Sequence, residues 1–250
     1  MDDRSFPALD WPGLEHLLRK DPDFGAAARS LFRARRLRKI AEGREPVILE
    51  EGQPRVVVHL VPEGVPGTAA EIDFSSAGTI REGQLWPMHA GGSGPVWPNF
   101  DGLLNVARNN DSAYSYVQLF RSGAVEAVNA SLIRSRADAL SFTGSLFERE
   151  VFKVVLNSLA LQKQLGVEPP VYVMVSLLGV RRFTIRRERD DFSGEGRPID
   201  RDDLVIPEAA VGSFEADVNP AMLRVFDRVW NAAGWEGSPY FEEGEWTLKQ

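Results

Sequence analysis

Three consecutive β-type segments constrain this fold more than any other feature of the sequence. They are Phe100 to Arg108, Ala113 to Arg121, and Ala124 to Ile133. The residues between them, Asn109-Asn110-Asp111-Ser112 and Ser122-Gly123, are typical of tight turns. Connections this short join antiparallel neighbours, because a parallel pair needs a long crossover. The sequence therefore predicts an antiparallel meander over residues 100–133.

The remaining elements follow from the spacing of apolar residues. Residues 54–62 and 171–178 are nearly continuous apolar runs, which are typical of strands buried on both faces. Helical spacing predicts three helices, over residues 24–42, 145–165 and 219–233, and residues 203–207 suit a short edge strand. In the second helix, Ser145 and Glu148 have the spacing of a capping box. Together these elements predict an α+β fold, with a mixed, largely antiparallel sheet and helices packed mainly on one face.

The 250 residues suffice for one sizeable core without disulfides or structural metals. Three prolines and a short helical piece from Leu14 to Lys20 indicate an N-terminal arm over residues 1–22. Residues 23–240 form one predicted α+β domain, and residues 241–250 form a C-terminal tail. Within the domain, four prolines over residues 63–99 predict a long surface loop.

Composition points to the cytoplasm. The chain has no cysteine, which excludes disulfides and thiolate metal sites and favours a reducing compartment. Its first residues lack the basic start and apolar stretch of a signal peptide. The longest apolar run, Val171 to Val180, is too short to span a membrane. The net charge of −7 argues against a protein that coats nucleic acid with its whole surface, although a local basic patch is compatible with it.

Residues that could carry catalysis are sparse. The three histidines, His16, His59 and His89, lack the H-x-x-x-H spacing of a zinc site. His59 lies in an apolar strand and is predicted to be a hydrogen-bonded core residue. No nucleophile elbow, P-loop or dinucleotide fingerprint occurs. Carboxylates for a two-metal nuclease site would have to come from Glu148, Glu150, Asp200, Asp202 and Asp203. We therefore predict no catalytic residue, no metal and no cofactor.

Two groups of basic residues are the better functional candidates. On the helical wheel of residues 24–42, one predicted outer arc is basic, and an apolar arc lies opposite it. A second basic cluster surrounds Phe183, and arginines interleaved with an aromatic residue can bind phosphates and stack on bases. Both groups could contact nucleic acid or an acidic protein. The candidate contact residues are Arg29, Arg33, Arg35, Arg36, Lys39, Arg181, Arg182, Arg186 and Arg187.

Several segments together resemble a known family. They are Leu31 to Gly43, Val56 to Pro62, Asn99 to Leu104, Tyr116 to Ile133, Phe147 to Val180, and Val229 to Gly234. In this order they resemble the C-terminal region of bacterial proteins with an N-terminal Schlafen/AlbA-type domain, to which DNA binding is attributed. The resemblance covers most of residues 28–240 and implies a domain that works beside a nucleic-acid-handling module. Residues 1–27 are too few to form the Schlafen/AlbA-type domain, so its nucleic-acid-binding and ATP-related properties are not assigned to residues of this chain.

The leading prediction is a non-catalytic accessory subunit in the cytoplasm. It would bind a separately encoded protein partner, nucleic acid or both, without contact to a membrane. The family resemblance implies a nucleic-acid-handling bacterial complex, for example a defence system. One alternative is a metal-dependent nuclease. The other is a small-ligand sensor that uses Trp86, His89 and Trp97 of the loop over residues 63–99.

Overall fold

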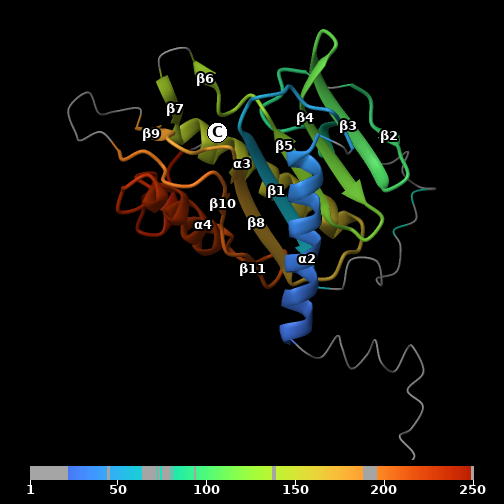
Figure 1. The fold of residues 1–250 in the computed structure, drawn as a ribbon. Coiled ribbons are helices and arrows are strands. Elements are labelled where there is room, and N and C mark those ends of the chain that lie inside the picture. The colour runs from blue at the N-terminus through green and yellow to red at the C-terminus, as the bar shows by residue number, and fades with distance from the viewer. Residues whose placement is uncertain are drawn as a thin grey trace, which may run out of the picture.

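An eight-stranded antiparallel sheet lies at the centre of the computed structural model, which describes residues 22–43, 46–63, 72, 74, 80, 82–92, 94–136, 139–187 and 196–248 (Figure 1). Its strands are β1 (Arg55–Pro62), β2 (Trp97–Pro98), β3 (Gly102–Asn109), β4 (Ser112–Phe120), β5 (Val125–Asn129), β8 (Val171–Leu178), β10 (Leu204–Val205) and β11 (Ala209–Val211). Their order is β10-β8-β1-β5-β4-β3-β2, with β11 also paired to β8. The predicted meander is confirmed as β3, β4 and β5, which pair in sequence.

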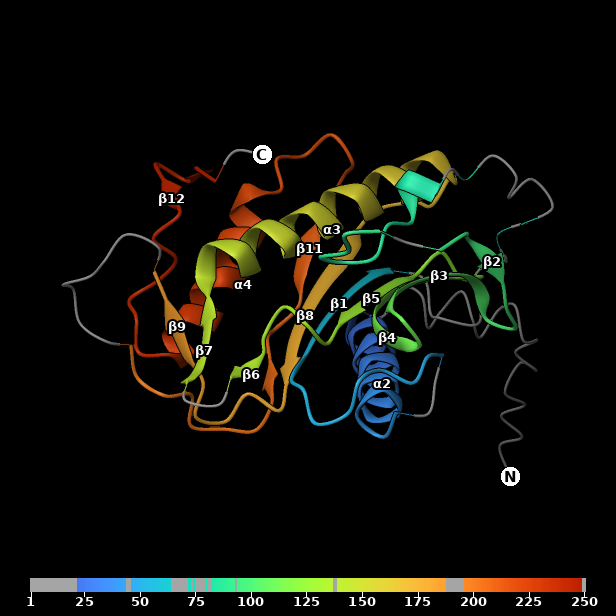
Figure 2. The ribbon, with the colours of Figure 1, turned by 90° about the horizontal axis from the view of Figure 1, so that it is seen from above.

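The helices cover both faces of this sheet unequally. They are α2 (Pro22–Ala41), α3 (Gly144–Gln164) and α4 (Asn219–Ala232). Figure 2 shows α3 and α4 above one face, while α2 alone crosses the other. The predicted α+β class, with helices mainly on one face, is confirmed. None of the described helices is long and apolar enough to cross a membrane. The predicted helical piece from Leu14 to Lys20 lies outside the described residues.

Coverage of both faces explains why β1 and β8 are apolar without alternation. Val56, Val58 and Leu60 of β1 belong to the core cluster that includes α3 residues. Val57 belongs to a second cluster together with Leu37 of α2. Since successive side chains of a strand point to opposite faces, a strand between two helical layers needs apolar residues at nearly every position. The strand β1 therefore contributes side chains to the core on both sides of the sheet.

Two small sheets complete the fold. One contains β6 (Ser135–Arg136), β7 (Ala139–Thr143), β9 (Thr184–Arg186) and a short parallel pairing between β7 and β9. The other is the hairpin of β12 (Phe241–Glu242) and β13 (Glu245–Trp246). The indole of Trp246 stacks on Phe152 of α3, with the two rings 4.5 Å apart. This part of the predicted tail therefore packs on the body.

The start of α3 differs from the prediction. Thr143 precedes the helix, and no side-chain hydrogen bond caps it, so the predicted capping box of Ser145 and Glu148 is wrong. The Glu148 side chain instead accepts hydrogen bonds from the indole N–H groups of Trp230, at 2.7 Å, and Trp246, at 3.0 Å. These donors come from segments far along the chain, and a local spacing rule contains no information about them.

Candidate functional site

The basic stripe of α2 faces the sheet, which corrects the predicted outer position of three arginines. Arg29, Arg33 and Arg36 are only 4%, 7% and 7% exposed. Arg36 donates two hydrogen bonds of 2.8 Å to the carboxylate of Glu126 on β5. The helical spacing predicts the two faces of α2 correctly. The buried face, however, is the one with the three arginines and not the predicted apolar arc. A buried guanidinium is tolerated here because the sheet supplies a carboxylate with matching fork geometry.

Glu126 is the centre of a closed, buried polar network. Besides Arg36, its carboxylate accepts a hydrogen bond from the Tyr116 hydroxyl at 2.8 Å and contacts His59 Nε2 at 2.9 Å. Burial raises the pKa of Glu126, but hydrogen bonds and charges from Arg36 and His59 outweigh this and lower it to about 2. Burial also raises the pKa of the Tyr116 hydroxyl.

This network serves structure rather than chemistry. His59, Tyr116 and Glu126 are all fully buried, so a substrate has no access to them. The prediction that His59 is a hydrogen-bonded core residue is confirmed. Glu126 was not predicted as a functional or structural residue. Its position as the one acidic residue of the apolar strand β5 could have indicated a buried carboxylate that needs a basic partner.

The other two arginines extend the same interface along α2. Arg29 lies 2.6 Å from Glu208 and stacks over the ring of Tyr172 at 3.4 Å. Arg33 donates to the backbone carbonyl of Ile206 at 2.6 Å and to Ser176 Oγ at 2.8 Å. These contacts occupy the guanidinium groups that were predicted to meet phosphates. The three arginines hold α2 against β8, β5 and the segment between β10 and β11.

The opposite face of α2 is exposed, and we call it the outer face of α2. Its members are Ala27, Leu31, Ala34, Arg35, Arg38 and Ala41. Leu31 is 52% exposed. The Arg35 and Arg38 side chains form no hydrogen bond or ion pair with any other residue in the described part of the chain. Lys39 lies at the margin and is partly buried.

The arginines of the second basic cluster do not form one surface, because their side chains have different surroundings. Arg181 forms a 2.8 Å ion pair with Asp202, and Arg187 lies over the Trp235 ring at 4.1 Å. Arg182 and Arg186 are exposed. Phe183 is only 4% exposed and belongs to the main core, so the predicted stacking of a base on this ring is wrong.

The carboxylates considered for a nuclease site do not converge. Glu148 is buried among indoles, and burial raises its pKa to about 7 although three donors favour the charged form. Glu150 pairs with His89, while Asp202 pairs with Arg181. Asp203 accepts a hydrogen bond from the backbone N–H of Gly179. Among the described residues, no group of three or more possible ligands is placed to hold a metal ion.

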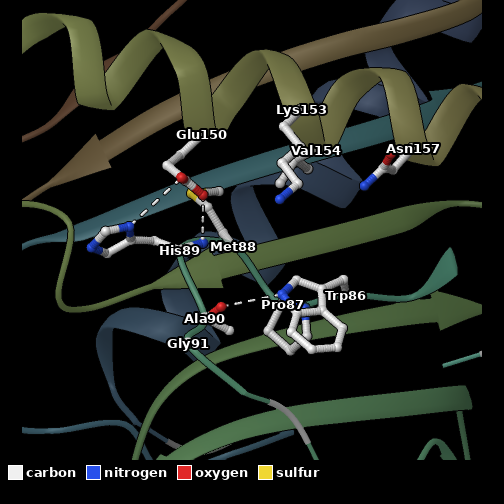
Figure 3. Close-up of a pocket in the computed structure, with 10 residues that line it drawn as sticks. All are labelled: Trp86, Pro87, Met88, His89, Ala90, Gly91, Glu150, Lys153, Val154 and Asn157. Carbon is white, nitrogen blue, oxygen red and sulfur yellow. Dashed lines mark hydrogen bonds and ion pairs between the residues drawn. The ribbon is translucent and has the colours of Figure 1, made fainter. Parts of the chain in front are cut away.

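A pocket of about 330 Å³ lies between α3 and the loop over residues 86–91 (Figure 3). From α3 it is lined by Glu150, Lys153, Val154 and Asn157, and from the loop by Trp86, Pro87, Met88, His89, Ala90 and Gly91. The α3 residues follow helical spacing, so they share one face. Trp86 and His89 were predicted to line a ligand site together with Trp97, and the structure brings these two to one pocket. Lys153 and Asn157 were missed because nothing local links α3 to the loop.

Trp97 lies in a different place, at the outer edge of the sheet. Two shallow hollows, of about 670 and 530 Å³, both include Trp97 and Arg108 in their lining. Close to Trp97 in the sequence, Phe100 is 95% exposed, and Ile48 in the lining of the larger hollow is 72% exposed. The predicted trio of Trp86, His89 and Trp97 is therefore divided between two sites.

Neither models of protein families, nor curated proteins, nor solved structures gave a match to this chain.

Proposed function

We propose that this protein is a non-catalytic accessory subunit that binds an acidic helix of a separately encoded partner protein through the outer face of α2. The observation that supports the proposal is the orientation of α2. Three of its arginines are buried against the sheet. Leu31 and three alanines therefore face solvent, flanked by Arg35 and Arg38. Exposed apolar residues in helical register suit a helix partner, and small residues permit a close approach.

Charge specifies the kind of partner. Arg35 and Arg38 have no acidic partner among the described residues, so carboxylates of an incoming helix would gain ion pairs without breaking existing ones. Nucleic acid is a weaker fit to this face, because an exposed leucine and alanines contribute nothing to phosphate binding. The resemblance to proteins with a Schlafen/AlbA-type domain supports a partner from a nucleic-acid-handling complex, such as a bacterial defence system.

The test is a tagged capture from the native host, followed by affinity measurement with the purified partner. Leu31→Asp and the double variant Arg35→Glu/Arg38→Glu should each weaken binding at least tenfold. Arg224→Glu serves as the matched control, because Arg224 is an exposed arginine on α4, away from this face. Equal affinity of all three variants would disprove the proposed face. Co-purified nucleic acid that survives Leu31→Asp but not Arg35→Glu/Arg38→Glu would replace the protein partner with nucleic acid.

The two alternatives gain less from the geometry. A metal-dependent nuclease would need converging carboxylates, and the described carboxylates that were considered for it have separate partners. A ligand site is supported by the pocket between α3 and the loop over residues 86–91, and such a site is compatible with the subunit function.

A further inference from the structure

The loop that forms the floor of the pocket is fixed before any ligand arrives. Buried side chains of the sheet hold its backbone: Asn129 Nδ2 donates to the carbonyl of Met88 at 2.7 Å, and Ser115 Oγ donates to the same carbonyl at 2.9 Å. Asn105 Nδ2 holds the carbonyl of Leu85 at 2.8 Å. Three polar side chains buried in β3, β4 and β5 thus hydrogen-bond to the backbone carbonyls of Leu85 and Met88, which makes the pocket preformed.

His89 shows that the loop carries strain. Its φ of 52° lies in the left-handed region, which a residue with a β-carbon seldom adopts. The backbone N–H of His89 donates to Glu150 Oε2 at 2.8 Å, and His89 Nδ1 lies 3.7 Å from Glu150 Oε1, as Figure 3 shows. Strained positions that the surroundings hold in place are concentrated at binding sites.

Besides His89, the lining of the pocket carries one acidic group, Glu150, and one basic group, Lys153. Burial raises the pKa of Glu150, but the hydrogen bonds from His89 and the nearby charges of His89 and Lys153 outweigh this and lower it. Glu150 therefore stays ionised, and its oxygens are engaged by His89. Lys153 is exposed and forms no hydrogen bond or ion pair within the described part of the chain. Its ammonium group remains for an anion, with the amide of Asn157 one turn further along α3.

The pocket also offers an aromatic surface. Trp86 is half-buried, and its indole N–H already donates to the carbonyl of Ala90 at 3.3 Å. What it can give to a ligand is the face or edge of its ring, while Val154 and Met88 add apolar lining. The volume is at the lower limit for small-molecule sites, which suits a compact ligand.

We propose that this pocket binds a small ligand built from a planar ring and one anionic group. The ring packs on Trp86, the anion pairs with Lys153, and Asn157 hydrogen-bonds to the anion or to a polar ring atom. Mononucleotides and aromatic carboxylates both belong to this chemical class. The site is separate from the outer face of α2, so its test is independent of the proposed subunit function.

Titration calorimetry on the full chain tests the proposal. AMP and indole-3-carboxylate are the planar anions and distinguish the two sources, while adenosine, indole and inorganic phosphate each lack one half of the ligand. At least one planar anion should bind at least tenfold more tightly than its matched halves. Lys153→Met and Trp86→Leu should each reduce that affinity at least tenfold, and Lys163→Met, on the same helix but paired with Glu215, should leave it unchanged.

Three results would overturn the proposal. One is that neither planar anion binds the wild-type chain. Another is that inorganic phosphate or the neutral ring binds as tightly as the whole ligand, because then only half of the predicted site is used. The last is unchanged affinity in Lys153→Met with the fold intact by circular dichroism, a variant in which loss of an exposed ammonium leaves the core untouched.

Discussion

A single buried carboxylate joins three strands and a helix in this protein. Glu126 on β5 receives hydrogen bonds from Arg36 on α2 and Tyr116 on β4, and it contacts His59 on β1. A charge in such a position is expensive to desolvate, and only its partners make it tolerable. Removal of the Glu126 carboxylate would therefore destabilise the fold mainly because the buried guanidinium of Arg36 would lose its ion-pair partner.

Glu126→Gln should destabilise the protein strongly. The amide is neutral, and its NH₂ group would face the donors of Arg36 or His59. Breaking one side of a buried ion pair costs about 3–5 kcal/mol of unfolding free energy. Urea unfolding followed by circular dichroism measures this, with Glu215→Gln as the exposed control, whose ion pair with Lys163 lies at the surface. A similar small loss in both variants would contradict the assigned role of Glu126.

Glu148 predicts a pH dependence of the opposite sense to most carboxylates. Burial raises its pKa from 4.5 to about 7, so the native state holds its proton over a range in which the unfolded chain has lost it. The unfolding free energy should therefore fall as the pH rises from 4.5 to 7, and this contribution should level off above 7. The pKa difference corresponds to on the order of 3 kcal/mol.

The measurement compares urea unfolding of wild type and Glu148→Gln at pH values from 4.5 to 8. The variant is expected to be less stable at low pH, because its amide cannot accept from Trp230, Trp246 and Ser238 together. The difference between the two proteins should shrink as the pH rises from 4.5 to 7 and stay constant above 7. A constant difference across this range would show that Glu148 is ionised throughout.

At the scale of elements, the long strands of the main sheet were predictable and the orientation of α2 was not. Short turns between β-type segments predict the meander, and continuous apolar runs predict β1 and β8. Both are local features of the sequence. For α2, the period of the sequence defines two faces but not which of them meets the sheet. That choice depends on Glu126, Glu208 and Ser176, which lie 90 to 179 positions further along the chain.

The candidate pocket was predictable only on one side. Trp86 and His89 stand out as an aromatic and a titratable residue in a glycine- and proline-rich loop. Lys153 and Asn157 look like ordinary solvent-facing residues of a helix, and only the packing of the loop against α3 brings them to the same pocket. The short strands β7 and β9 were missed for a related reason, because they pair with each other although they lie far apart in the sequence.

The start of β3 depends on one glycine. Gly102 has a φ of 152°, and a β-carbon there would lie 2.0 Å from the backbone oxygen of Leu119 on β4. Gly102→Ala should therefore separate the first pair of the meander and cost more than about 3 kcal/mol, or prevent folding. Gly212→Ala is the matched control, since no atom lies within 4 Å of its β-carbon position. Soluble expression and thermal melting of both variants give the answer, and equal melting temperatures would contradict the assigned packing.

At the scale of the whole molecule, the charges of α2 divide into two populations with different responses to salt. Arg29, Arg33 and Arg36 are buried against the sheet, whereas Arg35 and Arg38 face solvent. At 0.1 M salt, exposed charges more than about 10 Å apart are largely screened from each other, whereas buried pairs are screened much less. The buried arginines of α2 stabilise the fold, and the exposed ones belong to the proposed partner contact. A change in ionic strength should therefore affect partner binding much more than stability.

Raising NaCl from about 50 to about 500 mM should leave the urea midpoint of the isolated protein nearly unchanged, because the docking of α2 depends on buried pairs. Over the same range, affinity for the acidic partner should fall at least tenfold, since Arg35 and Arg38 act across an interface rim. The variant Arg35→Glu/Arg38→Glu should bind weakly at every salt concentration and retain the wild-type midpoint. If instead salt lowered the midpoint and left partner affinity unchanged, the assignment of buried and exposed arginines on α2 would be reversed, and the outer face of α2 would lose its role.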